Sequence, residues 1–392
     1  MDSTDSRLEL PKGLSIGADH NYHQKEEPTM KRTNQVIACI LLIVMLLTTL
    51  PACATDSQNS LNGNSKEPRV VVDIVGDEVI IPAEVNTVVC LVPFGCQIMI
   101  GLGLGDYLVG INDETIETPW IEVMYPRIKE IPTYGYEPDV EAVLAANPDV
   151  VLCADQETAQ EFRDKGVPAV TIMYYSVDDF KNTVTLIGTI LGGEALERCN
   201  AYLEYLDAVV DDVDAHLRDK VTKRETLYYI NGTSDRGFYK TAGAGSTNDA
   251  VAQLSYADFA TNPILQSPET KVDAEAILSQ NPENIIIGGR WQHVLYEELM
   301  ASPEWSSISA VKNGNVFKVP MGMAAWNRYS IEIALMIPWT ASVMYPEYYE
   351  FDAVQETIDF YKRFSGYELS VEQATFIVKG LTPDGEKEIA SR

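Results

Sequence analysis

The sequence predicts an α/β protein of two Rossmann-like lobes, each with a mostly parallel sheet, joined by one long helix, with a ligand cleft between the lobes. Three observations lead to this prediction. The first is an internal repeat, in which DVEAVLAANPD at 139–149 returns as DAEAILSQNPE at 273–283. The second is the alternation of strand-like apolar runs with helical stretches in both halves of the chain. The third is one long segment with helical periodicity between those halves.

The first lobe begins with two β-rich runs. RVVVDIVGDEVIIP (69–82) predicts a hairpin that turns at Gly76-Asp77, and TVVCLV (87–92) predicts a buried strand. We expect PFGC (93–96) to be a loop before an apolar helix. The remaining elements predicted for this lobe are a helix at 97–105, a strand at 107–112, a strand at 149–153, a helix at 156–165 and a strand at 168–173.

The repeat predicts the same supersecondary unit in each lobe. In the first copy, Pro138-Asp139 starts a short helix and Asn147-Pro148 stops it before a strand. The second copy also ends in Asn-Pro and also continues into an apolar, strand-like run, NIIIG. Each copy therefore marks one βαβ element, and the chain contains two like lobes.

Between the lobes, apolar residues from Leu196 to Leu217 recur at steps of three and four. This spacing predicts a helix of roughly 25 residues, or ~38 Å, which is long enough to span two lobes. Gly192-Gly193 separates it from a shorter helix. In the second lobe we predict strands at 225–231, within 281–289 and at 315–320, followed by helices at 331–345 and 354–364 that pack on this lobe.

The N-terminal segment indicates export. Met30-Lys31-Arg32 precedes the apolar run VIACILLIVMLLTTL (36–50), which suits a signal peptide better than a membrane span. The run ends in LPAC (50–53), which resembles a bacterial lipobox and makes Cys53 the expected lipidation site. The expected organisation is a mis-called start at 1–29, a lipoprotein signal peptide at 30–52, a flexible tether at 53–68, an N-terminal lobe at 69–192, an interlobe helix at 193–220 and a C-terminal lobe at 221–392.

The net charge excludes one class of function, and the cysteine spacing indicates no disulfide framework. The chain has 29 Lys and Arg against 58 Asp and Glu, a net charge of −29, which repels nucleic acid. Four cysteines follow Cys53 without a CxxC pair, so buried free thiols are the default expectation, although export makes a disulfide possible. These cysteines are Cys90, Cys96, Cys153 and Cys199.

In their order and spacing, several stretches resemble the substrate-binding proteins of ABC importers for ferric siderophores, haem or cobalamin, in which one long helix joins the lobes. YGYEPDVEAVLAANPDVVLC resembles the first-lobe motif, and EWSSISAVKNGNVFKVP resembles the late second-lobe motif. The resemblance covers roughly 69–365. It implies a monomer held at the outer face of the cell membrane by its lipid, with an ABC permease and its ATPase as partners.

The resemblance also implies a role for the repeat. In such proteins one exposed glutamate per lobe docks onto arginines of the permease, and the matching residues here are Glu141 and Glu275. A glutamate in the first turn of a helix is also favoured by the helix macrodipole, which offers a purely structural reading.

The residues just past the predicted strand ends are candidates for the cleft, because parallel sheets bind ligands there. Aromatic side chains suit a planar or greasy chelate, and arginines suit its carboxylates or catecholates. The predicted ligand-binding residues are Phe94, Tyr134, Tyr136, Tyr174, Tyr175, Arg236, Tyr239, Lys240, Arg290, Trp291, Trp326 and Arg328, with Asp155 and His293 as further candidates.

The leading expectation is a non-enzymatic protein that delivers an iron(III)-siderophore-type chelate to its permease. No cofactor is expected, because only His216 and His293 follow residue 52 and a metal would arrive inside the chelate. Cobalamin and haem stay open as cargoes, since Tyr134, Tyr174, His293 or Met321 could ligate haem iron. Two other classes stay open on the same fold: an exported enzyme, which would need a nucleophile beside an oriented base, and a sensory lipoprotein without a permease.

Overall fold

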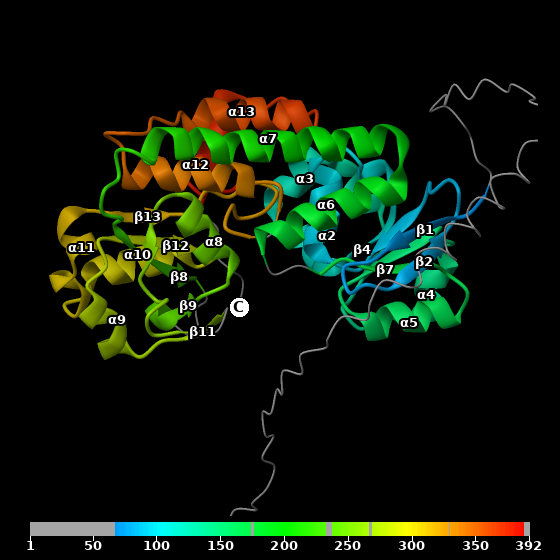
Figure 1. Cartoon of the computed structure of the whole chain (residues 1–392), viewed down its shortest axis with the longest axis horizontal. Helices are drawn as coiled ribbons and strands as arrows, with labels where there is room; N and C mark the ends of the chain where they lie inside the picture. Colours follow the sequence, from blue (N-terminus) through cyan, green and yellow to red (C-terminus); the bar gives the residue numbers. More distant parts are fainter. Residues whose placement is uncertain (1–66, 174–175, 233–236, 266–268, 329, 388–392) are drawn as a thin grey trace, which may run out of the picture. The chain divides into compact units, whose positions relative to one another are not determined.

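The computed structural model describes residues 67–387, except 174–175, 233–236, 266–268 and 329 (Figure 1). The predicted leader, Cys53 and nearly all of the tether lie outside the described residues. Within the described part, none of the helices is both long and apolar enough to span a bilayer.

The first lobe contains a five-stranded sheet in the order β5-β4-β3-β6-β7, and all of its neighbouring strands are parallel. Its residues are almost all buried, as expected for strands covered on both faces. The strands are β3 (Val88–Cys90), β4 (Leu108–Asn112), β5 (Thr133–Tyr134), β6 (Val150–Cys153) and β7 (Ala169–Thr171). The helices are α2 (Pro93–Gly101), α3 (Pro119–Met124), α4 (Val140–Ala145), α5 (Gln156–Asp164) and α6 (Val177–Leu191), with 3₁₀ turns at Gly105–Tyr107, Asp113–Glu117 and Pro126–Glu130.

The predicted hairpin is present as β1 (Arg69–Val72) and β2 (Glu78–Ile81), which pair antiparallel. The expected loop at 93–96 is wrong, because α2 already begins at Pro93. Proline is well suited to the first position of a helix, where its fixed φ fits and its missing N–H would have no partner anyway. This earlier start brings Phe94 into the first turn of a helix.

The two copies of the repeat fold alike. Asp139 caps α4 and Asp273 caps α9 (Ala274–Gln280), and each carboxylate accepts the backbone N–H two residues on. Asn147 and Asn281 then both adopt a left-handed backbone, with φ of 50° and 47°. Asparagine tolerates this conformation, so each copy turns directly into its strand. The predicted βαβ repeat is confirmed in its helix, its stop and its following strand.

Helix α7 (Gly193–Leu217) is the predicted 25-residue connection, three residues shorter at its end than expected. Gly192, with a φ of 71°, separates it from α6. One face of α7 is buried, and it packs against α6 and against α12 (Ile333–Met344). Figure 1 shows α7 extending alongside elements of both lobes.

The second lobe has a parallel sheet in the order β10-β8-β12-β13 and a small antiparallel pair, β9 and β11. The strands are β8 (Thr226–Asn231), β9 (Lys240–Ala242), β10 (Asp258–Phe259), β11 (Glu269–Lys271), β12 (Asn284–Gly288) and β13 (Val316–Lys318). The further helices are α8 (Thr247–Leu254), α10 (Gln292–Ala301), α11 (Ser309–Asn313), α13 (Ala353–Phe364) and α14 (Val371–Val378), with 3₁₀ turns at Gly237–Tyr239 and Trp305–Ser307.

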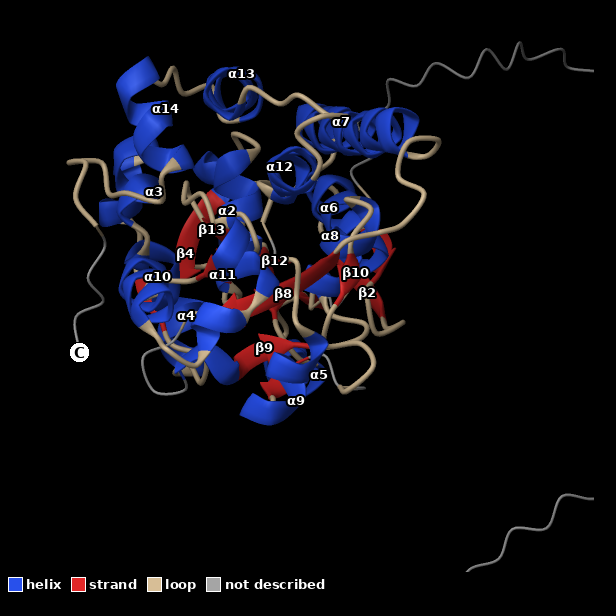
Figure 2. Ribbon diagram, turned by 90° about the vertical axis from the view of Figure 1, so that its left-hand side faces the viewer, coloured by secondary structure: helices blue, strands red, loops and turns tan. Residues whose placement is uncertain are grey.

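The C-terminal helices do more than cover the second lobe. The ring of Phe364 meets Tyr202 of α7 edge-on at 5.4 Å between centroids, so α13 packs on the connecting helix. Trp120 of the first lobe donates to the carbonyl of Leu381 at 2.8 Å. Figure 2 shows α13, α12 and α7 along one side of the molecule, away from α5 and α9. The C-terminal part of the chain therefore contacts the connecting helix and the first lobe as well as the second lobe.

Candidate functional site

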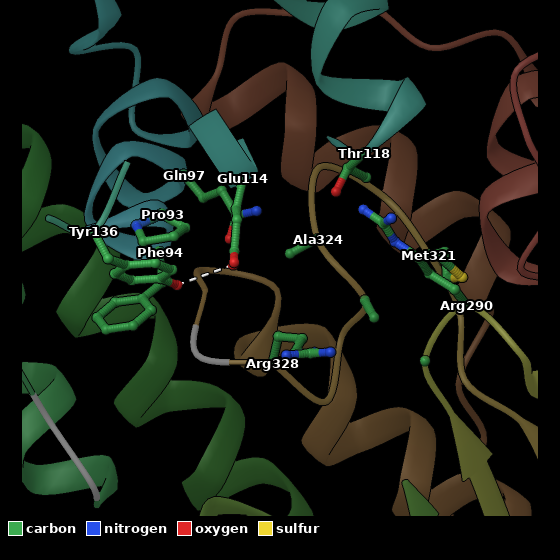
Figure 3. Close-up of a pocket in the computed structure, with 12 residues that line it drawn as sticks. Pro93, Phe94, Gln97, Glu114, Thr118, Tyr136, Arg290, Met321, Ala324 and Arg328 are labelled. Carbon is green, nitrogen blue, oxygen red and sulfur yellow. Dashed lines mark hydrogen bonds between the residues drawn. The ribbon is translucent and has the colours of Figure 1, made fainter. Parts of the chain in front are cut away.

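A cavity of about 260 Å³ is lined by residues of both lobes (Figure 3). The first lobe contributes the start of α2 and the segments that follow β4 and β5. The second lobe contributes the residues after β12 and the loop between β13 and α12. The lining residues are Pro93, Phe94, Gln97, Glu114, Thr118, Tyr136, Gly289, Arg290, Met321, Ala324, Ala325 and Arg328.

The cavity is positioned by sheet topology. Every lining segment follows the carboxyl end of a parallel strand, which is where open α/β sheets bind ligands. Pro93, Phe94 and Gln97 lie in the first turns of α2, immediately after β3. The side chain of Gln97 is nearly buried, and α2 forms part of the first-lobe wall.

Two guanidinium groups reach the cavity from the second lobe. Arg290 lies two residues beyond the end of β12 and is half-buried, whereas Arg328 is exposed on the loop before α12. Figure 3 shows Arg290 on the side opposite Glu114, Tyr136 and Phe94. Guanidinium groups bind carboxylate or other oxyanions with paired, charge-assisted hydrogen bonds.

A carboxylate and a phenol meet on the first-lobe side. The Tyr136 hydroxyl donates to Oε2 of Glu114 at 2.9 Å. Burial, reinforced by Glu114, raises the pKa of Tyr136 to about 12, so the phenol keeps its proton and stays a donor. Glu114 is itself held in place, because its backbone N–H donates to the buried side chain of Asn112 at 2.9 Å.

Four predicted ligand-binding residues line this cavity together: Phe94, Tyr136, Arg290 and Arg328. The haem-ligand candidate Met321 also lines it. Sequence reasoning missed Glu114, Gln97 and Thr118. Glu114 had a detectable signal, since it stands two residues beyond a predicted strand, and Gln97 is the one polar residue in an apolar helix.

Five other predicted residues are not among those that line this cavity. Trp326 is fully buried in the core, and Trp291 packs half-buried against the core of the second lobe. The Tyr134 hydroxyl lies 3.4 Å from the carbonyl oxygen of Ala142. Tyr239 donates to Glu304 at 3.1 Å, and Lys240 begins β9.

Three more predictions, Tyr174, Tyr175 and Arg236, lie outside the described residues. The further candidate Asp155 caps α5 by accepting the N–H of Thr158 at 2.8 Å. His293 is buried beside a second cavity, and its Nε2 lies 2.7 Å from the carbonyl oxygen of Gly380.

The described residues hold no group of three or more His, Cys, Asp or Glu that could bind a metal ion. Cys90, Cys96, Cys153 and Cys199 are buried thiols, and Cys96 donates to the carbonyl of Cys90 at 3.2 Å. Burial raises the pKa of Cys199 to about 12, which keeps that thiol unreactive.

The two glutamates of the repeat are both exposed in the first turn of a helix. Glu141 forms an ion pair with Lys165 at 2.9 Å, in which both side chains remain more than half exposed. Such an exposed pair is weak, so Glu141 can exchange Lys165 for another cation at little cost.

The two lobes, the helix that connects them and the polar cavity lined by both are the architecture of a two-lobed binding protein. Residues 88–321 match the family model described as periplasmic binding protein, and the chain belongs to this family. The predicted resemblance and the predicted fold class are therefore confirmed.

Among curated relatives, the chain is 24% identical to the uncharacterized ABC transporter substrate-binding lipoprotein YvrC of Bacillus subtilis, over 74% of this chain and 90% of the relative. It is 23% identical to the molybdate-binding protein MolA of Haemophilus influenzae, over 86% of this chain and 97% of the relative. It is 21% identical to the Fe(3+)-citrate-binding protein YfmC of Bacillus subtilis, over 76% and 92%. A solved structure of MolA bound to molybdate superposes with a TM-score of 0.68 at 22% identity, covering 77% of this chain and 99% of that chain, which shows the shared fold. These named relatives are binding proteins, in agreement with a substrate-binding rather than an enzymatic role.

Proposed function

We propose that this chain is the substrate-binding lipoprotein of an ABC importer and that its cargo is a compact anionic metal chelate of the iron(III)-carboxylate or small-siderophore type. The observation that carries the proposal is the presence of Arg290 and Arg328 at one small cavity between the lobes. In a chain of net charge −29, two cations at a cavity that has one lining carboxylate favour an anionic ligand.

The size of the cavity favours a compact cargo. Its volume of about 260 Å³ is smaller than the roughly 300–1,000 Å³ of sites for drug-sized ligands. Haem is close to the upper size limit of such ligands and cobalamin exceeds it. Either cargo would require the lobes to separate further. A chelate of one metal ion with small carboxylate ligands suits the cavity better.

Glu114 favours a chelate over a bare oxyanion. A molybdate-like ion presents only oxygen acceptors, and the carboxylate of Glu114 repels it. A metal chelate has a positive centre and hydroxyl or water donors, from which the oxygens of Glu114 and Tyr136 can accept hydrogen bonds. The arginines can bind the anionic groups of the same chelate. The second candidate is an oxyanion such as molybdate, which the match to MolA supports.

Delivery to a permease is part of the proposal. Glu141 and Glu275 are exposed at matching places in the two lobes, so that basic sites on a permease could engage both. Lipidation of Cys53 would tether the protein at the outer face of the cell membrane. One of the relatives is also named a lipoprotein.

Calorimetric titration of the purified protein tests the cargo. Ferric citrate, a ferric hydroxamate siderophore, molybdate, haem and cobalamin are each titrated at the same ionic strength. We expect saturable one-to-one binding of a ferric chelate, weakened by salt, and weaker or no binding of the others. Tighter binding of molybdate would favour the second candidate, and no binding of any anion would refute the proposal.

A further inference from the structure

The second lobe carries another cavity, of about 450 Å³, that shares no lining residue with the first. It lies beside β13, the last strand of its sheet, and is bounded by α10, α12 and the segment after α14. Its volume falls within the range of sites that hold organic ligands.

One part of its lining is apolar. Phe317 of β13 and Trp339 of α12 meet edge-on, with ring centroids 6.5 Å apart. Val343 of α12 and Leu381 extend this surface. These side chains can hold an aliphatic chain or an aromatic ring, which gains free energy by leaving water.

Another part of the lining is basic. Lys318, Lys379 and Lys387 line the cavity, and no Asp or Glu is among its described lining residues. The nearby Glu297 forms an ion pair with Lys387, so it offsets one of the three positive charges. A local excess of positive charge in a chain of net charge −29 attracts an anion.

Lys318 is half-buried in this lining. Its ammonium group lies 3.9 Å from the centroid of the Tyr296 ring, a cation–π contact. Burial, and then the neighbouring Lys387, lowers the pKa of Lys318. A bound anion would stabilise the charged ammonium in this half-buried position.

The open edge of β13 adds hydrogen-bonding groups. The carbonyl of Asn315 and the N–H of Val319 both bond to β12, so residues at odd positions face that strand. Val316 and Lys318 therefore direct their backbone groups to the other edge, where none of the described strands pairs with them. A carboxylate or sulfonate near this edge can accept hydrogen bonds from the N–H groups of Val316 and Lys318.

We propose that this cavity is a second ligand site, for an organic anion with an apolar body and one carboxylate or sulfonate group. The apolar part lies on Phe317 and Trp339, and the anionic group lies among the lysines. This site is independent of the proposed cargo cavity, and its occupation does not require a metal chelate.

The probe is 8-anilinonaphthalene-1-sulfonate, titrated into the purified protein and followed by its own fluorescence, with displacement by dodecanoate. We expect one saturable site at which dodecanoate competes and dodecanol does not. Replacing two of the three lysines, in K318M/K379M, should weaken binding of the probe by about tenfold or more. The control K129M/K312M removes the same charge elsewhere and should leave the affinity unchanged.

A second variant keeps the test informative if the lysine variant folds poorly. V343W fills the cavity without changing charge and should abolish probe binding, whereas R290A/R328A should not affect it. The proposal is overturned if the probe binds K318M/K379M and V343W as tightly as it binds the unmodified protein. It is equally overturned if R290A/R328A removes binding, since the probe would then occupy the first cavity.

Discussion

The phenolic oxygen of Tyr361 lies 2.9 Å from Oε1 of Glu332, and this hydrogen bond ties α13 to the end of the loop that forms one wall of the first cavity. Glu332 is fully buried, and it also accepts the N–H of Ala324 at 3.0 Å and the hydroxyl of Ser330. Burial raises the pKa of Glu332. The carboxylate of Glu332 thus binds both Ala324 and Ser330, and it fixes the segment between them, which includes the cavity residue Arg328.

Tyr361→Phe should therefore reduce both stability and cargo binding. The change removes the donor to Glu332 and the acceptor for the N–H of Met323. A buried polar group left without its partner costs about 1–3 kcal/mol, so the free energy of unfolding measured in urea should fall by that amount. The exposed Tyr348→Phe is the matched control and should change neither property. Equal unfolding curves for the two variants would contradict the role assigned to this bond.

Removal of Arg328 should weaken the cargo without unfolding the protein, because its side chain is exposed on the loop. A hydrogen bond to a charged group contributes about 1.5–3 kcal/mol, so Arg328→Ala should raise the Kd of a ferric chelate about 10- to 150-fold. Arg127→Ala, which removes a partly exposed arginine paired with Asp106, should leave Kd unchanged. Calorimetry measures both, and an unaltered Kd for Arg328→Ala would exclude the arginine from the binding site.

Replacing Glu141 and Glu275 together with alanine should abolish uptake by cells while ligand affinity stays the same. Both side chains are exposed at the start of helices α4 and α9, away from the residues that line the cavity. The loss of favourable macrodipole interactions should lower stability by only about 0.3–1 kcal/mol for each. Glu157 and Glu372, exposed in the first turns of α5 and α14, provide a control pair. Normal uptake by the double variant would disprove docking through these residues.

Acidification should destabilise the protein through His293. Burial lowers the pKa of His293 below its ordinary value of 6.5. At a pH between the pKa of His293 in the folded protein and 6.5, its pKa in the unfolded chain, the unfolded chain binds more protons than the folded protein. The free energy of unfolding therefore falls as the pH drops below about 6.5. His293→Gln keeps a donor for the Gly380 carbonyl and should flatten this dependence, whereas the exposed His216→Gln should not. Thermal unfolding at several pH values gives the slopes, and equal slopes for the two variants would contradict this prediction.

Much of the fold was predictable because its signals are local. Hairpin, strands and repeat are encoded by side-chain alternation, by apolar runs and by the caps at Asp139 and Asp273. The length of α7 followed from its periodic apolar face. The start of α2 was missed although Pro93 is a helix-start signal, because the short PFGC segment also reads as a turn.

The candidate site was only partly predictable. Position at a strand end was enough to select Phe94, Tyr136, Arg290 and Arg328, which line the cavity together. The same rule selected Trp326, which is buried in the core only two residues before the exposed Arg328. Irregular loops have no fixed period, so the direction of each side chain depends on what the loop packs against.

By itself, the sequence determined the α/β class, the duplicated lobes, the connecting helix and the acidic character, because each depends on neighbouring residues or on totals. Only the tertiary structure decided which side chains share a cavity, that Glu114 lines it together with the arginines, and that the C-terminal helices pack on α7. These relationships join residues more than a hundred positions apart, and their geometry is set by packing across the whole fold.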